Sequence, residues 1–195
     1  MKSVNALCAA LLAFTVGSYA QGHNQSAPFY LNLLSDDPGL NGTGLVPCHT
    51  GAAIENLCSA AILNASQALY GPFQFNTTAW SVAANSTAGE VGVLTYMLQG
   101  SNFNESEPMN LSYDSSSNIA APIFMPGYPQ LTVAFDSDNR LNIPTYTDTG
   151  YAPLYRWYLC DNSYYYKYRS IAWVVGPGVP DDASCCPVGI YRSWV

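Results

Sequence analysis

The sequence predicts an all-β domain, an antiparallel sandwich or barrel of about ten to twelve short strands. Apolar and polar residues alternate in runs of about four to eight residues, as in strands with one buried face. Clusters of Asp, Asn, Ser, Gly and Pro separate these runs, as at 36–39, 114–118, 136–139 and 176–178. Short strands at this spacing, without helices between them, are typical of sandwiches and barrels.

In chain order, the alternating runs lie at 29–33, 73–75, 91–97, 109–113, 131–135, 141–143, 155–159, 171–175 and 188–190. The clearest hairpin is 131–136 returning as 140–146 over an Asp-Ser-Asp-Asn turn. Segment 51–70 is alanine-rich and places Ile54, Leu57 and Ala61 at helical spacing, so helix and strand both stay open, with the nearby cysteines favouring a strand. A threefold β-trefoil is the alternative architecture for this number of strands.

The first twenty residues predict a cleaved signal peptide. Lys2 precedes an apolar run over 6–16 that is too short to span a bilayer. Small residues at Ser18 and Ala20 favour a mature start at Gln21, with a start at His23 as the alternative. We therefore expect a signal peptide at 1–20 and a single disulfide-stabilised β domain at 21–195.

The charge balance excludes two classes of partner. Without Lys2, five basic and thirteen acidic side chains give a net charge of −8, and only 10% of the chain is charged. Nucleic acids and anionic membrane surfaces both require a basic face, so neither is an expected partner.

N-glycosylation is predicted in the first two-thirds of the chain. Seven Asn-x-Ser/Thr sequons lie there, and none has proline at the middle position: Asn24, Asn41, Asn64, Asn76, Asn85, Asn104 and Asn110. The last third of the chain has none, which favours it as a bare contact surface.

Five cysteines remain after removal of the signal peptide, and an oxidising compartment favours their pairing. Locality favours Cys48 with Cys58. Cys160 then pairs with Cys185 or Cys186, and the sequence leaves that choice open. The odd thiol is available for a disulfide-linked dimer.

Several short motifs carry a family resemblance. They include Cys48-His49-Thr50-Gly51-Ala52-Ala53, Tyr155-Arg156-Trp157-Tyr158-Leu159-Cys160 and Ile171-Ala172-Trp173-Val174-Val175-Gly176. Together they resemble a family of small secreted ascomycete proteins with no established activity. The resemblance implies a fungal origin, export, an all-β fold and two disulfides, whereas the second cysteine of the Cys185-Cys186 pair is additional to the family pattern.

Catalytic chemistry finds little support in the sequence, so no catalytic, cofactor-binding or metal-binding residue is assigned. The alternative function is a small secreted copper-dependent oxidative enzyme or copper-binding protein, with nitrogen ligands from His23 and His49. A glycoside hydrolase ranks after it, because its carboxylate candidates, Asp136 with Asp138, Asp181 with Asp182 and Glu105 with Glu107, all appear in turn-like polar contexts.

A tyrosine-rich segment is the candidate contact surface. Tyr164, Tyr165 and Tyr166 are consecutive, so at least one ring should be exposed, and Tyr168 follows closely. Packing of these rings on one another across strands is the alternative. The sequence thus favours a secreted, non-catalytic protein of the extracellular space or fungal cell wall, with a polysaccharide or an extracellular host protein as its partner.

Overall fold

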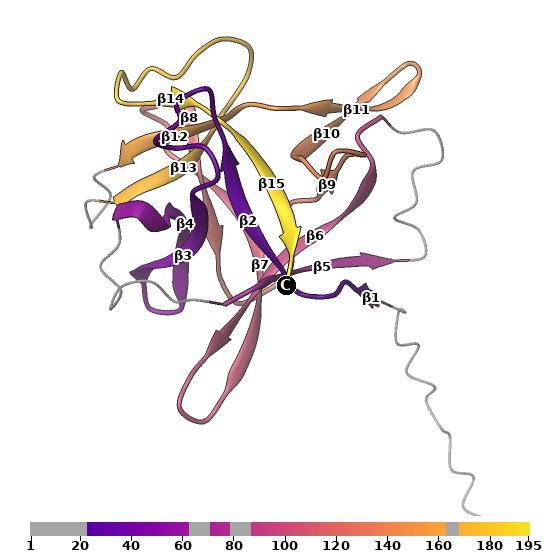
Figure 1. Cartoon of the computed structure of the whole chain (residues 1–195). Helices are drawn as coiled ribbons and strands as arrows, with labels where there is room; N and C mark the ends of the chain where they lie inside the picture. The colour runs from indigo at the N-terminus through magenta and orange to yellow at the C-terminus, as the bar shows by residue number, and fades with distance from the viewer. Residues whose placement is uncertain (1–22, 63–70, 79–86, 163–167) are drawn as a thin grey trace, which may run out of the picture.

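The structure is a computed structural model that describes residues 23–62, 71–78, 87–162 and 168–195 (Figure 1). Within these ranges the chain forms strands and one short 3₁₀ turn, η1 (Ala60–Ile62), and no α-helix. The predicted all-β class is confirmed. The predicted signal peptide lies outside the described residues.

The strands are mostly short, and alternation of apolar residues gives each barrel strand an inner and an outer face. In chain order they are β1 (His23–Gln25), β2 (Phe29–Leu34), β3 (Gly44–Gly51), β4 (Ile54–Ser59), β5 (Phe73–Thr78), β6 (Glu90–Gln99), β7 (Asn104–Tyr113), β8 (Ile119–Phe124), β9 (Val133–Phe135), β10 (Leu141–Thr147), β11 (Gly150–Leu154), β12 (Trp157–Asn162), β13 (Tyr168–Val174), β14 (Cys186–Pro187) and β15 (Gly189–Trp194).

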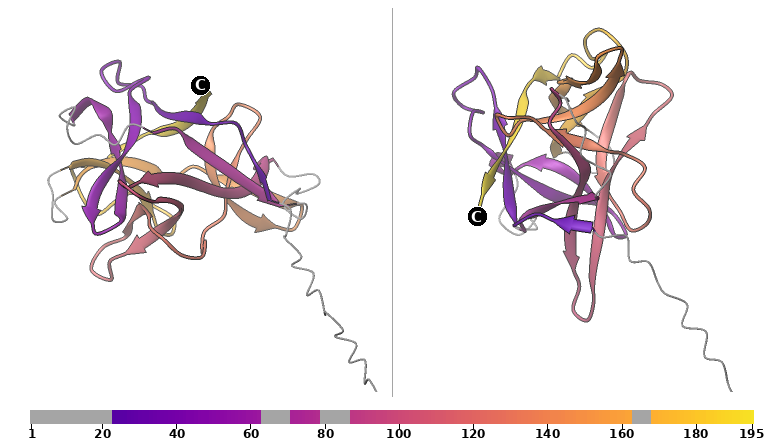
Figure 2. Two further views of the ribbon diagram at one scale, coloured as in Figure 1. Left: turned by 90° about the horizontal axis from the view of Figure 1, so that it is seen from below. Right: turned by 90° about the vertical axis from the view of Figure 1, so that its right-hand side faces the viewer.

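Eight antiparallel strands close into a barrel in the order β5-β2-β3-β4-β13-β8-β7-β6, and β6 pairs back onto β5 (Figures 1 and 2). This pairing order has no threefold pattern. The β-trefoil alternative is therefore wrong, and the barrel prediction is confirmed.

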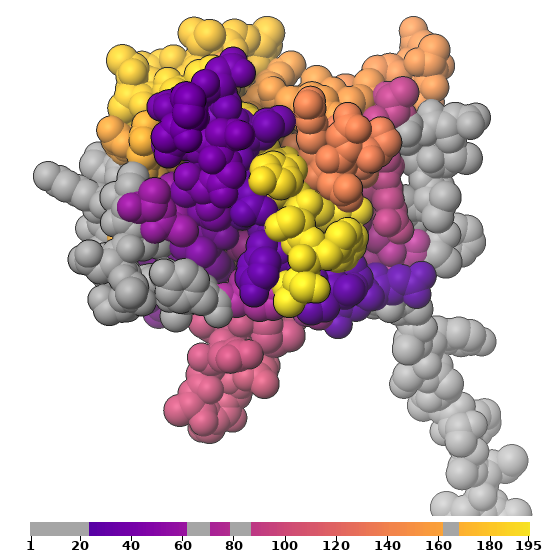
Figure 3. Space-filling view, in the orientation of Figure 1, coloured from indigo at the N-terminus to yellow at the C-terminus, as the bar shows by residue number. Residues whose placement is uncertain are grey.

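The remaining strands extend the barrel wall. β9, β10 and β11 continue from β6, β12 and β14 continue from β13, and β1 lies beside β5. The last strand, β15, pairs with β2 over six residues and lies on the molecular surface beside it (Figure 3). Sequence-distant parts of the chain thus form one continuous wall.

Large side chains fill the barrel. Phe29, Leu31 and Leu33 alternate along β2 with no exposed surface, and Phe73 and Phe75 repeat the pattern on β5. The burial of these apolar side chains is the main contribution that stabilises a domain of this length.

Two local predictions can be compared directly with the structure. The 131–146 hairpin is present: Phe135 of β9 pairs with Leu141 of β10, and Asn139 has the positive φ of 61° that Asn tolerates in tight turns. In segment 51–70, residues 54–59 form strand β4 and residues 60–62 form η1, so the strand alternative is confirmed there. Residues 63–70 lie outside the described part.

No helix among the described residues is long and apolar enough to cross a membrane.

Candidate functional site

The predicted tyrosine surface falls mostly outside the described residues. Tyr164, Tyr165 and Tyr166 belong to the segment 163–167, for which the structure describes nothing. Tyr168 begins β13 and is half-buried. The contact surface at this place stays a prediction.

The seven sequons differ in exposure. Asn24, Asn41 and Asn104 are exposed, whereas Asn76 and Asn110 are half-buried. The Oδ1 atom of Asn110 accepts a hydrogen bond of 2.8 Å from the Gln130 backbone N–H. Asn64 and Asn85 lie outside the described residues.

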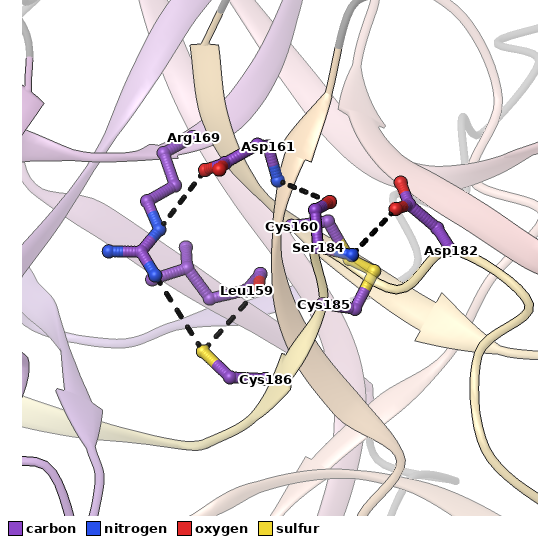
Figure 4. Close-up of polar contacts among 8 residues, drawn as sticks. All are labelled: Leu159, Cys160, Asp161, Arg169, Asp182, Ser184, Cys185 and Cys186. Carbon is purple, nitrogen blue, oxygen red and sulfur yellow. Dashed lines mark hydrogen bonds and ion pairs between the residues drawn. A yellow bond between two sulfur atoms is a disulfide. The ribbon is translucent and has the colours of Figure 1, made fainter.

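Strand register decides which cysteine bonds to Cys160. Leu159 of β12 pairs with Cys186 of β14, so Cys185 is opposite Cys160. Neighbouring residues of a strand point to opposite faces, so Cys185 shares a face with Cys160 and Cys186 does not. The structure accordingly contains a Cys160–Cys185 disulfide (Figure 4). It also contains the predicted Cys48–Cys58 disulfide.

Among the described cysteines Cys186 is the free thiol, and it lies on the Leu159 side of the sheet. Its Sγ atom is 3.6 Å from the Leu159 carbonyl oxygen and 3.9 Å from Nη2 of Arg169 (Figure 4). Arg169 also forms an ion pair of 3.3 Å with Asp161. The Cys186 side chain is half-buried, and its thiol contacts groups of the neighbouring strands β12 and β13.

The structure places the two histidines on separate strands. His23 begins β1 and His49 is on β3, with β5 and β2 between them in the strand order. Among the described residues, no three or more His, Cys, Asp or Glu side chains form a group able to hold a metal ion.

Two of the three predicted carboxylate contexts are turns. Asp136 Oδ1 accepts hydrogen bonds from the backbone N–H groups of Asp138 and Arg140, at 2.9 and 2.8 Å. Asp181 accepts from the Ser117 hydroxyl at 2.8 Å and from the Asn118 N–H at 3.1 Å. These carboxylates organise turns.

The turn-like context expected for Glu107 is wrong. Glu107 lies inside strand β7 with no exposed surface, on the same inward face as Met109. Glu55 of β4, which no motif singled out, is only 2% exposed and shares its inward face with Leu57. The signal that could have found both residues is a Glu at the inward position of an otherwise apolar alternation.

The two glutamates lie at the same end of the barrel, from which the β6–β7 hairpin projects (Figure 1). Glu107 is directly opposite Tyr96, and Glu55 is directly opposite Phe124. Burial, then hydrogen bonding and charge from Glu55, then charge from Glu105, raise the pKa of Glu107 from 4.5 to about 8. Burial and the two glutamates raise the pKa of Tyr96 to about 12.

A hollow lies on the opposite, outward face of the same strands. It is a groove of about 570 Å³ over β5, β6 and β7, bordered by Gln25 of β1 and by the loop between β8 and β9. The alternation that turns Glu107 inward turns Ser106 and Pro108 outward into this groove.

The groove has a neutral, hydrogen-bonding lining. None of the described side chains that line it is charged, and six are polar: Gln25, Asn76, Thr78, Thr95, Ser106 and Thr132. Tyr128 does not itself line the groove, but it lies in the chain between Gly127 and Pro129, which both do, and its side chain is 92% exposed. An exposed aromatic ring beside neutral donors and acceptors fits an uncharged, hydroxyl-rich ligand.

A second hollow of about 480 Å³ has a different character. Asp36, Arg140 and Tyr155 line it, and the Tyr155 hydroxyl donates a hydrogen bond to Asp136. Burial and that hydrogen bond raise the pKa of Tyr155 to about 12. Charged side chains in its lining distinguish this hollow from the neutral groove, which we take as the candidate binding site.

Comparison with known proteins identifies a family for this chain. No curated protein and no solved structure matches the chain. Residues 26–194, which include all strands from β2 to β15, match the family described as a domain of unknown function, DUF7907. The chain therefore belongs to the DUF7907 family.

Proposed function

We propose that this chain is an exported, N-glycosylated fungal protein of the extracellular space or cell wall, and that it binds a neutral saccharide without catalysis. The neutral groove is the observation that carries the proposal, and the exposed Tyr128 lies next to two of its lining residues in the chain. Saccharides are recognised by hydroxyl and amide groups together with a flat apolar surface, and this groove offers both.

Export has separate support. Two disulfides are typical of proteins in oxidising compartments, and the first twenty residues have the pattern of a signal peptide. The resemblance to secreted ascomycete proteins supports the fungal origin. A wall polysaccharide is the neutral saccharide that such a protein meets first.

Retention on insoluble polysaccharide tests the binding. We expect the purified protein to be retained on chitin or β-glucan. Soluble oligosaccharides of the same polymer should release the protein, and the oligosaccharides should keep their length. The Tyr128→Ala variant should bind about tenfold more weakly, a loss of about 1.4 kcal/mol. The Ser106→Val variant, which replaces a groove hydroxyl by a methyl group, should also bind more weakly.

Tyr146→Ala is the matched control. Tyr146 is 77% exposed on the β10–β11 hairpin, and neither Tyr146 nor its chain neighbours line the groove. Its loss should leave retention unchanged. Equal effects of Tyr128→Ala and Tyr146→Ala, or retention on neither polymer, would overturn the proposal, and shortened oligosaccharide products would overturn its non-catalytic part.

A further inference from the structure

Glu55 and Glu107 bring two carboxyl groups into the barrel interior without the partners that two charges would need. Glu55 is 2% exposed and Glu107 is 0% exposed. Oε2 of Glu55 and both carboxyl oxygens of Glu107 have no donor within hydrogen-bond distance among the described residues. Two unpaired carboxylates in an apolar interior would be strongly unfavourable.

Among the described residues, the strands around the pair bring mainly neutral and acidic side chains; β13, which pairs with β4, carries Arg169, whose ion pair is with Asp161. β5 and β8 bring no titratable side chain, and β6 brings Tyr96. β7 adds Glu105, which is exposed and points to the same face as Glu107. β3 brings His49, an exposed residue directly opposite Glu55.

A proton on one carboxyl group resolves the problem. It removes one of the two charges and turns that carboxyl into a donor for the other, which satisfies an oxygen on each side. We propose that Glu55 and Glu107 share one proton, and that this proton makes the folded barrel more stable in acid than in mildly alkaline solution. The inference does not depend on the groove or its ligand.

The direction of the pH effect follows from the two states of the chain. In the unfolded chain a glutamate loses its proton near its ordinary pKa of 4.5, whereas the folded chain holds this proton to a pKa of about 8. Between these values the folded state binds more protons, so stability falls as pH rises and then levels off above the upper value. Below pH 4.5 this contribution is fully present.

Infrared spectroscopy of the wild-type protein is the first test. We expect the carbonyl band of a protonated, buried carboxylic acid at pH 6.5, where exposed glutamates are ionised, and its loss as the pH is raised past 9. The Glu105→Gln variant, altered at an exposed residue of the same strand face, should keep the band. Absence of the band at pH 6.5 would overturn the proposal even if no core variant folds.

Denaturation from pH 4.5 to 8.5 is the second test. The folded wild type should take up about one proton relative to the unfolded chain at pH 6.5, seen as a melting temperature that falls with pH. The Glu107→Gln variant should lose this part of the pH dependence, whereas Glu105→Gln and His49→Gln should keep it. An unchanged slope in Glu107→Gln would contradict the shared proton.

A bound cation is the competing occupant, and the same variants distinguish it. If calcium alone raised the melting temperature of the wild type at pH 8.5 and not that of Glu107→Gln, the pair would hold a metal ion and the proposal would be wrong. A calcium effect equal in both proteins, or none, agrees with the proton.

Discussion

Gly89 lies where the chain approaches the end of β9 too closely for a side chain. A Cβ atom placed there would overlap the carbonyl group of Phe135 and lie 2.9 Å from Cα of Asp136. Its φ of +87° is also a conformation that side chains disfavour. Space and backbone conformation both exclude alanine at this position.

We expect Gly89→Ala to lower the free energy of unfolding by about 3 kcal/mol, because strain and overlap add. Gly127 is the matched control: its φ of +131° is positive, but nothing lies within 4 Å of a Cβ atom there. Gly127→Ala should therefore cost about 1 kcal/mol, from backbone strain alone. Chemical denaturation measures both variants, and equal losses would contradict the close approach at Gly89.

Among the strands, the alternating pattern predicted most elements and missed those without a polar face. β2 and β5 have buried residues at every second position and were predicted. β3, with four consecutive buried residues, was not predicted. The pattern did predict β13, at 171–175, although five of its consecutive residues are buried: Ile171 and Trp173 face the barrel, and Ala172 and Val174 pack under the Cys160–Cys185 disulfide. The alternating pattern also did not decide between a closed barrel and a sandwich, since β4 pairs with β13 and β8, which lie in distant parts of the chain.

The candidate sites were less predictable than the strands. The groove is formed by outward side chains of β1, β5, β6 and β7, whose proximity depends on the pairing of those strands. The polar residues Glu105 and Ser106, which precede Glu107, led to the prediction of a polar context for it. The burial of a strand residue depends on the face of the sheet to which its side chain points, and not on its neighbours in the chain. The sequence placed Glu107 with Glu105, which is exposed, and gave no reason to consider it together with the buried Glu55.

Strand pairing also makes a prediction about the cysteines. Because Cys186 is opposite Leu159, we expect Cys186→Ser to leave both disulfides intact and change the melting temperature little. Cys185→Ser should lose the 160–185 bond and about 2–4 kcal/mol of stability. Alkylation of the unreduced, unfolded wild-type protein followed by peptide mapping should label Cys186; a label on Cys185 would contradict the register.

For the whole molecule, solubility has to come from groups other than charges. Only 10% of the chain is charged, and the formal net charge is −7. Several large side chains are nevertheless well exposed, including Tyr113, Tyr146 and Val179. Attached glycans would cover such a surface, and the described sequons extend from β1 to the β6–β7 hairpin and β7.

The occupied sequons should follow exposure in the folded barrel. Asn24, Asn41 and Asn104 are exposed and can carry a glycan without displacing protein atoms. Asn76 lies on the groove floor opposite Gln25 on one side and Val93 on the other, and its Oδ1 atom is buried. A glycan on Asn76 would fill the groove and close it to any external saccharide.

We therefore expect protein secreted from a fungal host to carry glycans at Asn24, Asn41 and Asn104 and none at Asn76. Enzymatic deglycosylation in heavy-oxygen water, followed by peptide mapping, marks each occupied asparagine with a mass increment. The Asn41→Gln variant is the control: it should lose the mark at position 41 alone and keep the wild-type retention on polysaccharide, because Asn41 is exposed and does not line the groove. A mark at Asn76 would mean that the chain's own glycan occupies the groove, and it would contradict the saccharide site proposed there while leaving the shared proton of Glu55 and Glu107 untouched.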